Sequence, residues 1–377
     1  MLLYIHYPFC RSKCSYCGFC SRVWDEELEE LYLSALLREV RFWGGRLDRR
    51  RITTLYIGGG TPSLMHPGIL ERLAEEIERH FTLADDLEFS LEANPDSLTP
   101  ERARSLAGLG VNRVSLGFQS LEGVQLRLLE RPHDAEQAFR SVDALRSAGV
   151  DNVGLDLLWG LPQQTPEDWL SQLKRVASLQ PEHISCYCLT LEEGTRMKAR
   201  VDCGELELPD EEQLEAMYLR GAELLESRGF IHYEIANFAR PGTMCRHNRG
   251  YWQGRDYLGL GPSAVSTLQG RRWANPSDVS CYAEAVSKGE LDRNGESLTR
   301  RQRIEELVLL SLRTREGLDL DRYRELTGED LFRKRAEVLR KLRDQGLVQS
   351  DERRLWLTTR GMLLCDAITG ALMPEDA

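Results

Sequence analysis

A group of cysteines near the start of the chain has a spacing suited to binding iron. Cys10, Cys14 and Cys17 follow the pattern C-x3-C-x2-C in one short loop. Three thiolates on one loop can hold three corners of a [4Fe–4S] cube and leave the fourth iron open for a substrate. The alternative is a zinc site that adds Cys20, but four ligands within eleven residues would be crowded. The spacing therefore favours Cys10, Cys14 and Cys17 as ligands of a [4Fe–4S] cluster.

The composition restricts the classes of partner. The chain has 377 residues and a formal net charge of −11, which argues against nucleic acid as the main partner because that affinity depends on Lys and Arg. Apolar residues make up 41% and charged residues 29%, as in soluble globular proteins. The mean hydropathy is −0.42, and no apolar run reaches the roughly 18–20 residues of a membrane span. We therefore expect a soluble protein that does not cross a membrane.

The ten cysteines also bear on the compartment. The first residues contain neither a basic segment nor a cleavage site, so no export signal is expected. In the reducing cytoplasm, clustered cysteines act as metal ligands or catalytic groups rather than as disulfides. The sequence thus predicts a cytoplasmic protein.

The elements that must position these residues alternate between β-rich runs and helical periodicity. The predicted strands are Leu2–His6, Ile52–Ile57, Leu87–Leu91, Arg113–Leu116, Val153–Leu158 and His183–Leu189. Several are nearly continuous in apolar residues, which is typical of parallel strands covered on both faces. Repeated β-then-α units imply right-handed crossovers. We predict an α/β fold with a partial (β/α)6 barrel, whose chemistry lies at the C-terminal ends of the strands.

The spacing of apolar residues predicts helices between these strands and beyond them. The predicted helical segments are 28–39, 70–77, Ala135–Ala148, Pro166–Leu179, Pro209–Arg228 and Leu331–Gln345. Gly346–Val348 and Leu355–Leu357 read as a small hairpin, so the C-terminal part resembles a winged-helix module. Because the chain is acidic, we expect this module to serve packing or dimerisation rather than nucleic-acid binding.

Polar and glycine-rich motifs follow the predicted strands. Gly59, Gly60 and Thr61 end the second strand, where glycine lets the backbone approach a ligand closely. Glu92 follows the third strand, where its carboxylate is more costly to bury than to expose. Gln119 and Asp156 lie at the ends of later strands.

These motifs together resemble a known superfamily. The run from Tyr4 to Cys17 resembles the opening of radical S-adenosylmethionine (SAM) enzymes of the coproporphyrinogen oxidase-like group. In that superfamily the open iron chelates SAM, and one-electron reduction cleaves SAM to a 5′-deoxyadenosyl radical. The resemblance implies a [4Fe–4S] cluster and SAM as cofactors. The SAM-binding residues implied by this resemblance are Tyr4, Tyr16, Gly59, Gly60, Thr61, Glu92, Gln119, Arg131 and Asp156.

Two members of the group differ in function. One is the oxygen-independent coproporphyrinogen III oxidase, and the other is the HemW family of haem chaperones. The oxidase has an extension before the first strand, whereas in this chain the first strand is expected to begin at residue 2. The oxidase also has a fourth motif cysteine, at the position where this chain has Phe19. The run from Cys17 to Ser21 follows the C-D-F-N-S of the chaperones, although Gly18 and Cys20 depart from it.

A later segment also favours the chaperones. Residues Cys245–Trp252 resemble their H-N-x-x-Y-W haem-binding signature. The resemblance implies His247 as an axial ligand of haem iron, for which imidazole is suited. Tyr251 and Trp252 can stack on a porphyrin, and Arg246 and Arg249 can pair with its propionates. Alternatively, this is a polar loop that packs at the barrel mouth.

The chain is therefore identified as a member of the HemW family. The implied partners are haem and haem-accepting proteins, and a homodimer is one expected assembly. The predicted domains are a core barrel at 1–200, a barrel completion with the haem-binding segment at 201–290, and a C-terminal domain at 291–377. Coproporphyrinogen oxidation is the alternative function, and a SAM-dependent enzyme acting on haem is a third.

Overall fold

The structure, a computed structural model, describes residues 1–373 and divides into two compact units. Unit 1 contains Met1–Gln163, Tyr187–Leu208 and Asp256–Glu296, and unit 2 contains Gln164–Cys186, Pro209–Arg255 and the chain from Ser297 onward. Both units are assembled from separate stretches of sequence. The limits of these units do not coincide with the domain boundaries expected at residues 200 and 290. Those domain boundaries stay predictions.

Unit 1 is built on a parallel sheet. Its central strands, in spatial order, are β1 (Leu2–Tyr7), β4 (Arg51–Gly59), β5 (Thr82–Ala93), β6 (Arg113–Gln119) and β7 (Asn152–Trp159). Every neighbouring pair among them is parallel. Nearly all residues of β1 and β6 are buried, because both faces of these strands are covered. The α/β class and the largely parallel sheet are confirmed.

Four short strands extend the sheet beyond β1. β11 (Tyr257–Leu260) pairs parallel with β1, and β12 (Val265–Leu268) and β13 (Arg271–Ala274) continue antiparallel, followed by β14 (Glu296–Ser297). This extension was not predicted, because the segment is polar and rich in glycine. Gly259 has a structural role there, since a Cβ at that position would lie 2.2 Å from the carbonyl oxygen of Val265.

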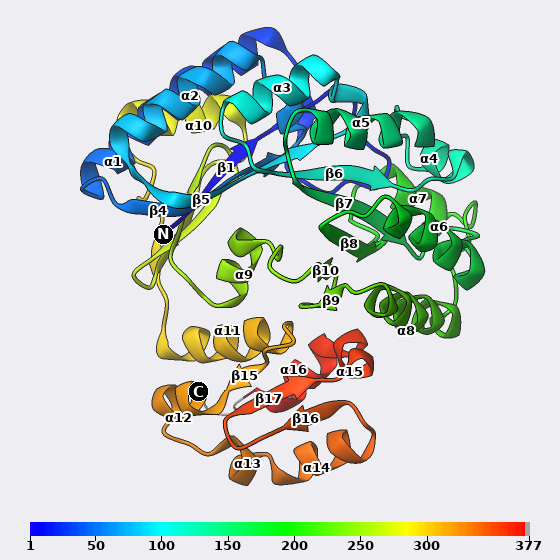
Figure 1. Cartoon of the computed structure of the whole chain (residues 1–377). Coiled ribbons are helices and arrows are strands. Elements are labelled where there is room, and N and C mark those ends of the chain that lie inside the picture. The colour runs from blue at the N-terminus through cyan, green and yellow to red at the C-terminus, as the bar shows by residue number, and fades with distance from the viewer. Residues whose placement is uncertain (374–377) are drawn as a thin grey trace. The chain divides into compact units, whose positions relative to one another are not determined.

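Helices cover the sheet of unit 1. They are α1 (Glu26–Arg46), α2 (Pro67–His80), α3 (Pro100–Gly108), α4 (Gly123–Leu128), α5 (Ala135–Ser147), α7 (Arg196–Asp202) and α10 (Val279–Lys288), with the 3₁₀ turns η1 (Pro62–Leu64) and η2 (Pro95–Ser97). Figure 1 shows α1, α2, α3 and α5 along one side of the strands. Most of these helices start at a side-chain cap, as where the carboxylate of Asp134 accepts from the Gln137 backbone N–H.

Unit 2 begins with a helix pair and a small sheet. Its first elements are α6 (Pro166–Ser178), β8 (His183–Cys188, of which residues 183–186 lie in this unit), α8 (Glu211–Ser227), β9 (Ile231–His232), β10 (Asn237–Ala239) and α9 (Arg246–Trp252). The indole of Trp169 on α6 donates to the Met217 carbonyl of α8 at 3.1 Å. Gly221 on α8 makes this approach possible, because a Cβ there would lie 2.8 Å from the indole nitrogen. With β8, all six predicted strands are confirmed.

The chain from Ser297 onward forms helices around a hairpin. Its elements are α11 (Arg300–Leu312), β15 (Leu318–Asp319), α12 (Leu320–Thr327), α13 (Leu331–Lys334), α14 (Ala336–Asp344), β16 (Val348–Ser350), β17 (Arg354–Leu357), α15 (Thr359–Leu363) and α16 (Cys365–Leu372). The predicted hairpin is present as β16 and β17, with β15 added to β17.

The prediction of one continuous helix over Leu331–Gln345 is wrong. The helix breaks at Arg335, where φ is −116° and ψ is 27°. The side chain of Arg335 donates to the carbonyl of Met373, a contact that local periodicity does not reveal. Within the described chain, none of the helices has the length and apolar character needed to cross a bilayer.

Candidate functional site

A pair of two-residue strands fixes both ends of the cysteine loop. β2 (Phe9–Cys10) pairs parallel with β3 (Arg22–Val23), so the chain leaves and returns at the same edge. Cys10 ends β2, and Cys14 and Cys17 lie in the loop between the two strands. All three are half-buried free thiols. The backbone N–H of Cys17 donates to the Cys14 carbonyl at 3.4 Å, which closes a turn between two of the three.

The middle of the loop is anchored through Ser15. Its hydroxyl donates to the Leu128 carbonyl at 2.8 Å, and its backbone N–H donates to the Leu129 carbonyl at 3.4 Å. The Met197 N–H at the start of α7 donates to the Ser15 carbonyl at 2.8 Å. Cys14 and Cys17 thus flank a residue that is held by two other segments of unit 1.

Glu130 adds a further anchor to the cysteine loop. Its φ is +55°, in the left-handed region where glycine meets no steric cost. The carboxylate forms an ion pair with Arg196, whose guanidinium also donates to the Lys13 carbonyl at 2.8 Å. Glu130 therefore links this turn, through Arg196, to the cysteine loop.

Two of the thiols receive hydrogen bonds from residues outside the cysteine loop. The Thr61 hydroxyl lies 3.5 Å from the Cys10 sulfur, and the Arg131 guanidinium lies 3.5 Å from the Cys14 sulfur. Burial raises the pKa of the Cys10 thiol, although the bond from Thr61 opposes this effect. Burial opposes the charge of Arg131, but neighbouring Tyr16 and Cys14 raise its pKa, so the guanidinium stays cationic. Donors of this kind stabilise metal-bound thiolate.

Asn94 connects these two donors. Its amide nitrogen donates to the Thr61 hydroxyl at 3.1 Å, and its amide oxygen accepts from Arg131 at 2.5 Å. Cys14, Thr61, Asn94 and Arg131 all line one small cavity. The sequence analysis did not assign a role to Asn94. Its place in the same strand-end run as Glu92 was the available signal.

Glu92 lies at the end of β5 in a second polar group. The Tyr56 hydroxyl donates to one carboxylate oxygen at 2.9 Å, and the Gly59 N–H donates to the other at 3.0 Å. Burial raises the pKa of Glu92 to about 7, against the effect of these two hydrogen bonds, and Asp156 raises it further. Glu92 is therefore held as an acceptor whose charge changes near neutral pH.

The glycines beside Glu92 are required by close contacts. Gly59 has a φ of +113°, and a Cβ there would lie 2.5 Å from the imidazole of His6. A Cβ on Gly60 would lie 2.5 Å from the Phe9 carbonyl oxygen. This turn therefore brings the backbone against the segment that carries Cys10.

The other predicted SAM residues lie in unit 1, three on strands of the sheet and Tyr16 in the cysteine loop. The Tyr4 hydroxyl is 3.0 Å from His6 Nδ1, and Asp156 accepts from the Ser115 hydroxyl at 2.9 Å. Burial raises the pKa of Tyr16, which packs beside Cys14 and Arg131. Gln119 ends β6 with a φ of +62°, next to an irregularity in the pairing with β7. Their roles toward SAM stay predictions.

The donor set fits the cofactors implied by the sequence. Two of the three thiols receive side-chain hydrogen bonds, and the Nε of Arg131 is buried without a partner among the described residues. Such a group calls for a further acceptor. In the described chain no three His, Cys, Asp or Glu side chains gather around one metal-ion position. A [4Fe–4S] cube spreads its ligands more widely than a single ion does, so the loop remains compatible with it.

Cys20 points away from this set. Its sulfur lies 3.6 Å from the Ser277 carbonyl oxygen, and its own carbonyl oxygen lies 2.7 Å from the imidazole of His6. Cys20 thus has contacts that link the loop to β1 and to the segment before α10.

The predicted haem segment forms α9 in unit 2, and its two faces differ. His247 is 1% exposed, and its Nε2 lies 2.9 Å from the Tyr251 hydroxyl one turn later. Arg249 forms an ion pair with Glu316 on a different side of the helix, as helical periodicity requires. The Trp252 ring lies 5.3 Å from the Arg313 guanidinium. The structure therefore does not bring all the predicted haem contacts onto one face.

Comparison with known protein families finds two matches. Residues 4–176 match the Radical SAM superfamily, and residues 298–364 match the HemN C-terminal domain. The first match covers the cysteine loop and the strand ends described above. The second covers α11 to α15.

Similar full-length proteins include two that share a name. "Heme chaperone HemW" of Bacillus subtilis is 35% identical over 99% of this chain and 99% of its own length. "Heme chaperone HemW" of Mycobacterium tuberculosis is 37% identical over 98% of this chain and 94% of its own length. A mouse protein, "Radical S-adenosyl methionine domain-containing protein 1, mitochondrial", is 34% identical over 99% of this chain and 87% of its own length.

A solved structure is similar as well. Coproporphyrinogen III oxidase (HemN) from Escherichia coli, described as a radical SAM enzyme, has a TM-score of 0.85 and 27% identity. The similarity covers 99% of this chain and 89% of that one. Both units of this chain therefore have counterparts in a known structure.

Proposed function

This chain belongs to the HemW family of the radical SAM superfamily, and on that basis we propose that it is a haem chaperone, which binds haem and transfers it to acceptor proteins. One observation carries the proposal. Relatives with the printed name of haem chaperone match 98–99% of the chain. That match spans the cysteine loop and strand ends of unit 1 and also the α9 segment of unit 2.

The proposal includes two resident cofactors in unit 1. Cys10, Cys14 and Cys17 hold the [4Fe–4S] cluster, which when bound supplies an iron with an open position for SAM. The residues proposed to contact SAM are Tyr4, Tyr16, Gly59, Gly60, Thr61, Glu92, Gln119, Arg131 and Asp156. Membership of the superfamily implies both cofactors.

The protein groups around these cofactors have separate tasks. Thr61 and Arg131 donate to ligand sulfurs and thereby stabilise the thiolate form. Asn94 holds both donors in place. Glu92 offers a carboxylate to the cationic end of SAM, and a nearby ammonium group favours its ionised form.

For haem, we propose His247 as the iron ligand. Its imidazole is buried against the Tyr251 hydroxyl, so iron can reach Nε2 only when that contact opens. Neutral imidazole binds haem iron well, and the other ring nitrogen fixes its orientation. The proposal therefore requires a change at the α9 segment when haem is ligated.

Replacement of His247 and Tyr251 tests this ligand with opposite expected effects. His247→Ala removes the nitrogen that ligates the iron. The affinity for haemin, measured from the Soret shift, is therefore expected to fall by about tenfold or more. Tyr251→Phe removes the competing hydroxyl, so haemin binds at least as tightly as it does to the wild-type chain. Absorbance titrations measure both. If both variants lose binding equally, the pair only supports the fold of α9 and His247 is not the ligand.

The oxidase alternative is favoured by the similarity to the Escherichia coli enzyme and has a direct test. Given coproporphyrinogen III, SAM and a low-potential reductant, the reconstituted chain is expected to form no protoporphyrinogen. Chromatography of the oxidised porphyrins measures the product. Turnover with release of carbon dioxide would replace the chaperone proposal with the oxidase. Intact haem after incubation with SAM would separate delivery from an enzyme that acts on haem.

We also propose that the protein acts in the cytoplasm and that a homodimer is its assembly. Neither proposal is needed for the assays above. Size measurement by light scattering tests the second.

A further inference from the structure

Unit 2 contains a cavity of about 450 Å³. Its walls come from β9, α9, α11, the loop before α12, α12 and β17. Ligand pockets in proteins usually measure roughly 300–1,000 Å³. The cavity is therefore large enough for a small organic ligand, and it lies outside the cofactor site of unit 1.

One face of α9 and the residue after it form part of the wall of this cavity. Arg249, Trp252 and Gln253 line it, whereas the lining does not include His247 or Tyr251. The Nε1 atom of Trp252 is buried without a hydrogen-bond partner among the described residues. Met244 and Leu307 add apolar side chains to the lining. An aromatic wall next to apolar side chains suits a planar aromatic ligand.

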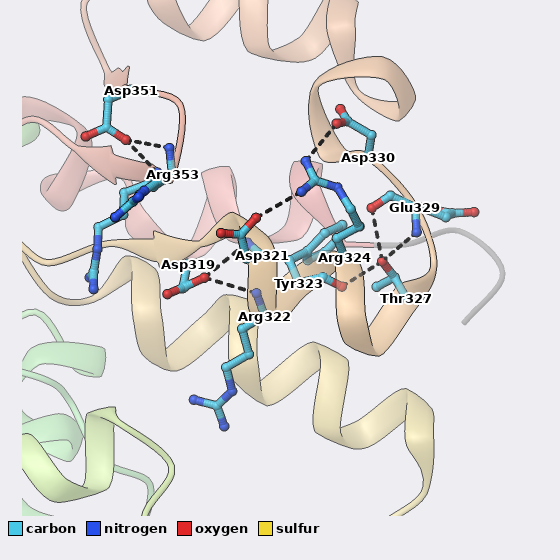
Figure 2. Close-up of polar contacts among 11 residues, drawn as sticks. Asp319, Asp321, Arg322, Tyr323, Arg324, Thr327, Glu329, Asp330, Asp351 and Arg353 are labelled. Carbon is cyan, nitrogen blue, oxygen red and sulfur yellow. Dashed lines mark hydrogen bonds and ion pairs between the residues drawn. The ribbon is translucent and has the colours of Figure 1, made fainter.

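The lining carries more positive than negative charge. Its charged side chains are Arg249, Arg315, Arg322 and Arg354 against Glu316 and Asp319. Glu316 is neutralised by an ion pair with Arg249, and Arg315 is paired with Glu226 outside the lining. Asp319 caps α12, where its carboxylate accepts from the backbone N–H groups of Asp321 and Arg322 (Figure 2).

Two guanidinium groups remain for an anionic ligand. Among the described residues, neither Arg322 nor Arg354 forms an ion pair. Figure 2 shows the Arg322 side chain extending away from Asp319 and Asp321, and its guanidinium donates to the Gln253 carbonyl at 3.5 Å. Arg354 donates to the Glu316 carbonyl at 3.1 Å. Because a guanidinium has five N–H donors, both groups can bind a carboxylate as well.

We propose that this cavity binds the porphyrin ring of haem without iron ligation, with Trp252 against the ring and Arg322 and Arg354 on its two carboxylates. This inference rests on the proposed function and adds a second position for its cargo. The cavity and His247 lie on different faces of α9, so the ring in the cavity does not need the imidazole. A chaperone that releases its cargo benefits from a position that depends on ring contacts and carboxylate pairing, because neither requires breaking an iron–nitrogen bond.

Metal-free protoporphyrin IX is the probe for this site. It has the ring and both carboxylates of haem but no iron, so His247 cannot ligate it. The wild-type chain and His247→Ala are expected to bind it equally, with quenching of tryptophan fluorescence. The double variant Arg322→Ala/Arg354→Ala is expected to bind protoporphyrin IX with an affinity lower by about tenfold or more, because both charged hydrogen bonds are lost. Trp252→Phe retains binding but reduces the quenching.

Arg303→Ala provides the matched control. Arg303 is an exposed cation on α11 outside the lining, so its loss changes the net charge by as much as Arg322→Ala alone does and is expected to leave binding unchanged. Circular dichroism checks the fold of each variant. Arg322 is exposed, so Arg322→Ala alone keeps the fold and still weakens binding severalfold.

The outcomes separate this inference from the proposed function. If haemin binds but protoporphyrin IX does not, the cavity proposal is wrong and the chaperone proposal stands. The cavity proposal is also wrong if protoporphyrin IX binds the double arginine variant as tightly as it binds the wild-type chain. If neither porphyrin binds the wild-type chain, both proposals fail.

Discussion

The triple variant Cys10→Ala/Cys14→Ala/Cys17→Ala is expected to bind no iron after anaerobic reconstitution, whereas the wild-type chain takes up about four irons. The three thiols lie on one loop whose ends and middle are fixed by β3, the segment after α4 and α7. Removing them leaves no protein donor for the cluster. Iron and sulfide analysis measures the loss, and the broad thiolate-to-iron absorption disappears with it.

Cys20→Ala is the matched control for this experiment. The Cys20 sulfur lies near the Ser277 carbonyl oxygen rather than among the three thiols, so this variant is expected to retain about four irons. Loss of iron in Cys20→Ala would make Cys20 a ligand. Stoichiometric zinc in the wild-type chain, in place of iron and sulfide, would contradict the cluster itself.

Glu92→Gln is expected to abolish SAM binding while stabilising the cofactor-free protein at alkaline pH. The pKa of Glu92 is raised to about 7 in the folded chain, above the ordinary value of 4.5. Between these two values the unfolded chain binds fewer protons at this residue than the folded chain does. Folding stability therefore falls as the pH rises from about 4.5 through 7, by at most about 3 kcal/mol from this residue.

The amide of glutamine removes that cost without losing the local hydrogen bonds. Its oxygen can accept from the Gly59 N–H, and its NH₂ group can donate to the Tyr56 hydroxyl, which turns around. Thermal unfolding of the cofactor-free protein at pH 5 and pH 8 measures the effect. The gain in melting temperature is expected at pH 8 and is small at pH 5. Calorimetric titration with SAM on the cluster-loaded protein measures the loss of binding.

Glu39→Gln is the contrasting control, because burial also raises the pKa of Glu39 to about 7. There the two oxygens accept from Gly261 N–H, the Asn275 amide and the Tyr282 hydroxyl. The NH₂ group of the new glutamine would face one of these hydrogen-bond donors, so the variant is expected to be less stable than the wild-type chain. Its affinity for SAM is expected to stay unchanged. Unchanged SAM affinity in Glu92→Gln would remove Glu92 from the SAM site.

Several parts of the fold follow from local sequence alone. The central strands of the sheet are predictable because strands covered on both faces must be nearly continuous in apolar residues. The helices start where a capping side chain precedes an amphipathic run, as at Thr165 before α6. The spacing of Cys10, Cys14 and Cys17 predicts their chemistry because one short loop carries all three thiols.

Other parts depend on contacts between distant residues. β11 lies beside β1 although about 250 residues separate them, and Gly259 permits the close packing of β11 against β12. At the helix break, Arg335 donates to the carbonyl of Met373, a residue 38 positions away. In both cases the contacting residues are distant in sequence. The periodicity of a short segment therefore could not predict the pairing of β11 with β1 or the contact of Arg335.

The candidate site shows the same division. By itself the sequence determined which residue types stand at the strand ends and in the cysteine loop, since motif order and spacing are local properties. Only the tertiary structure decided that Asn94 joins Thr61 to Arg131, and that Arg131 reaches Cys14 across 117 positions of sequence. It also decided that His247 is buried while Trp252 lines a cavity. Helical periodicity separates the faces of α9, but only the packing of distant segments determines which face is covered.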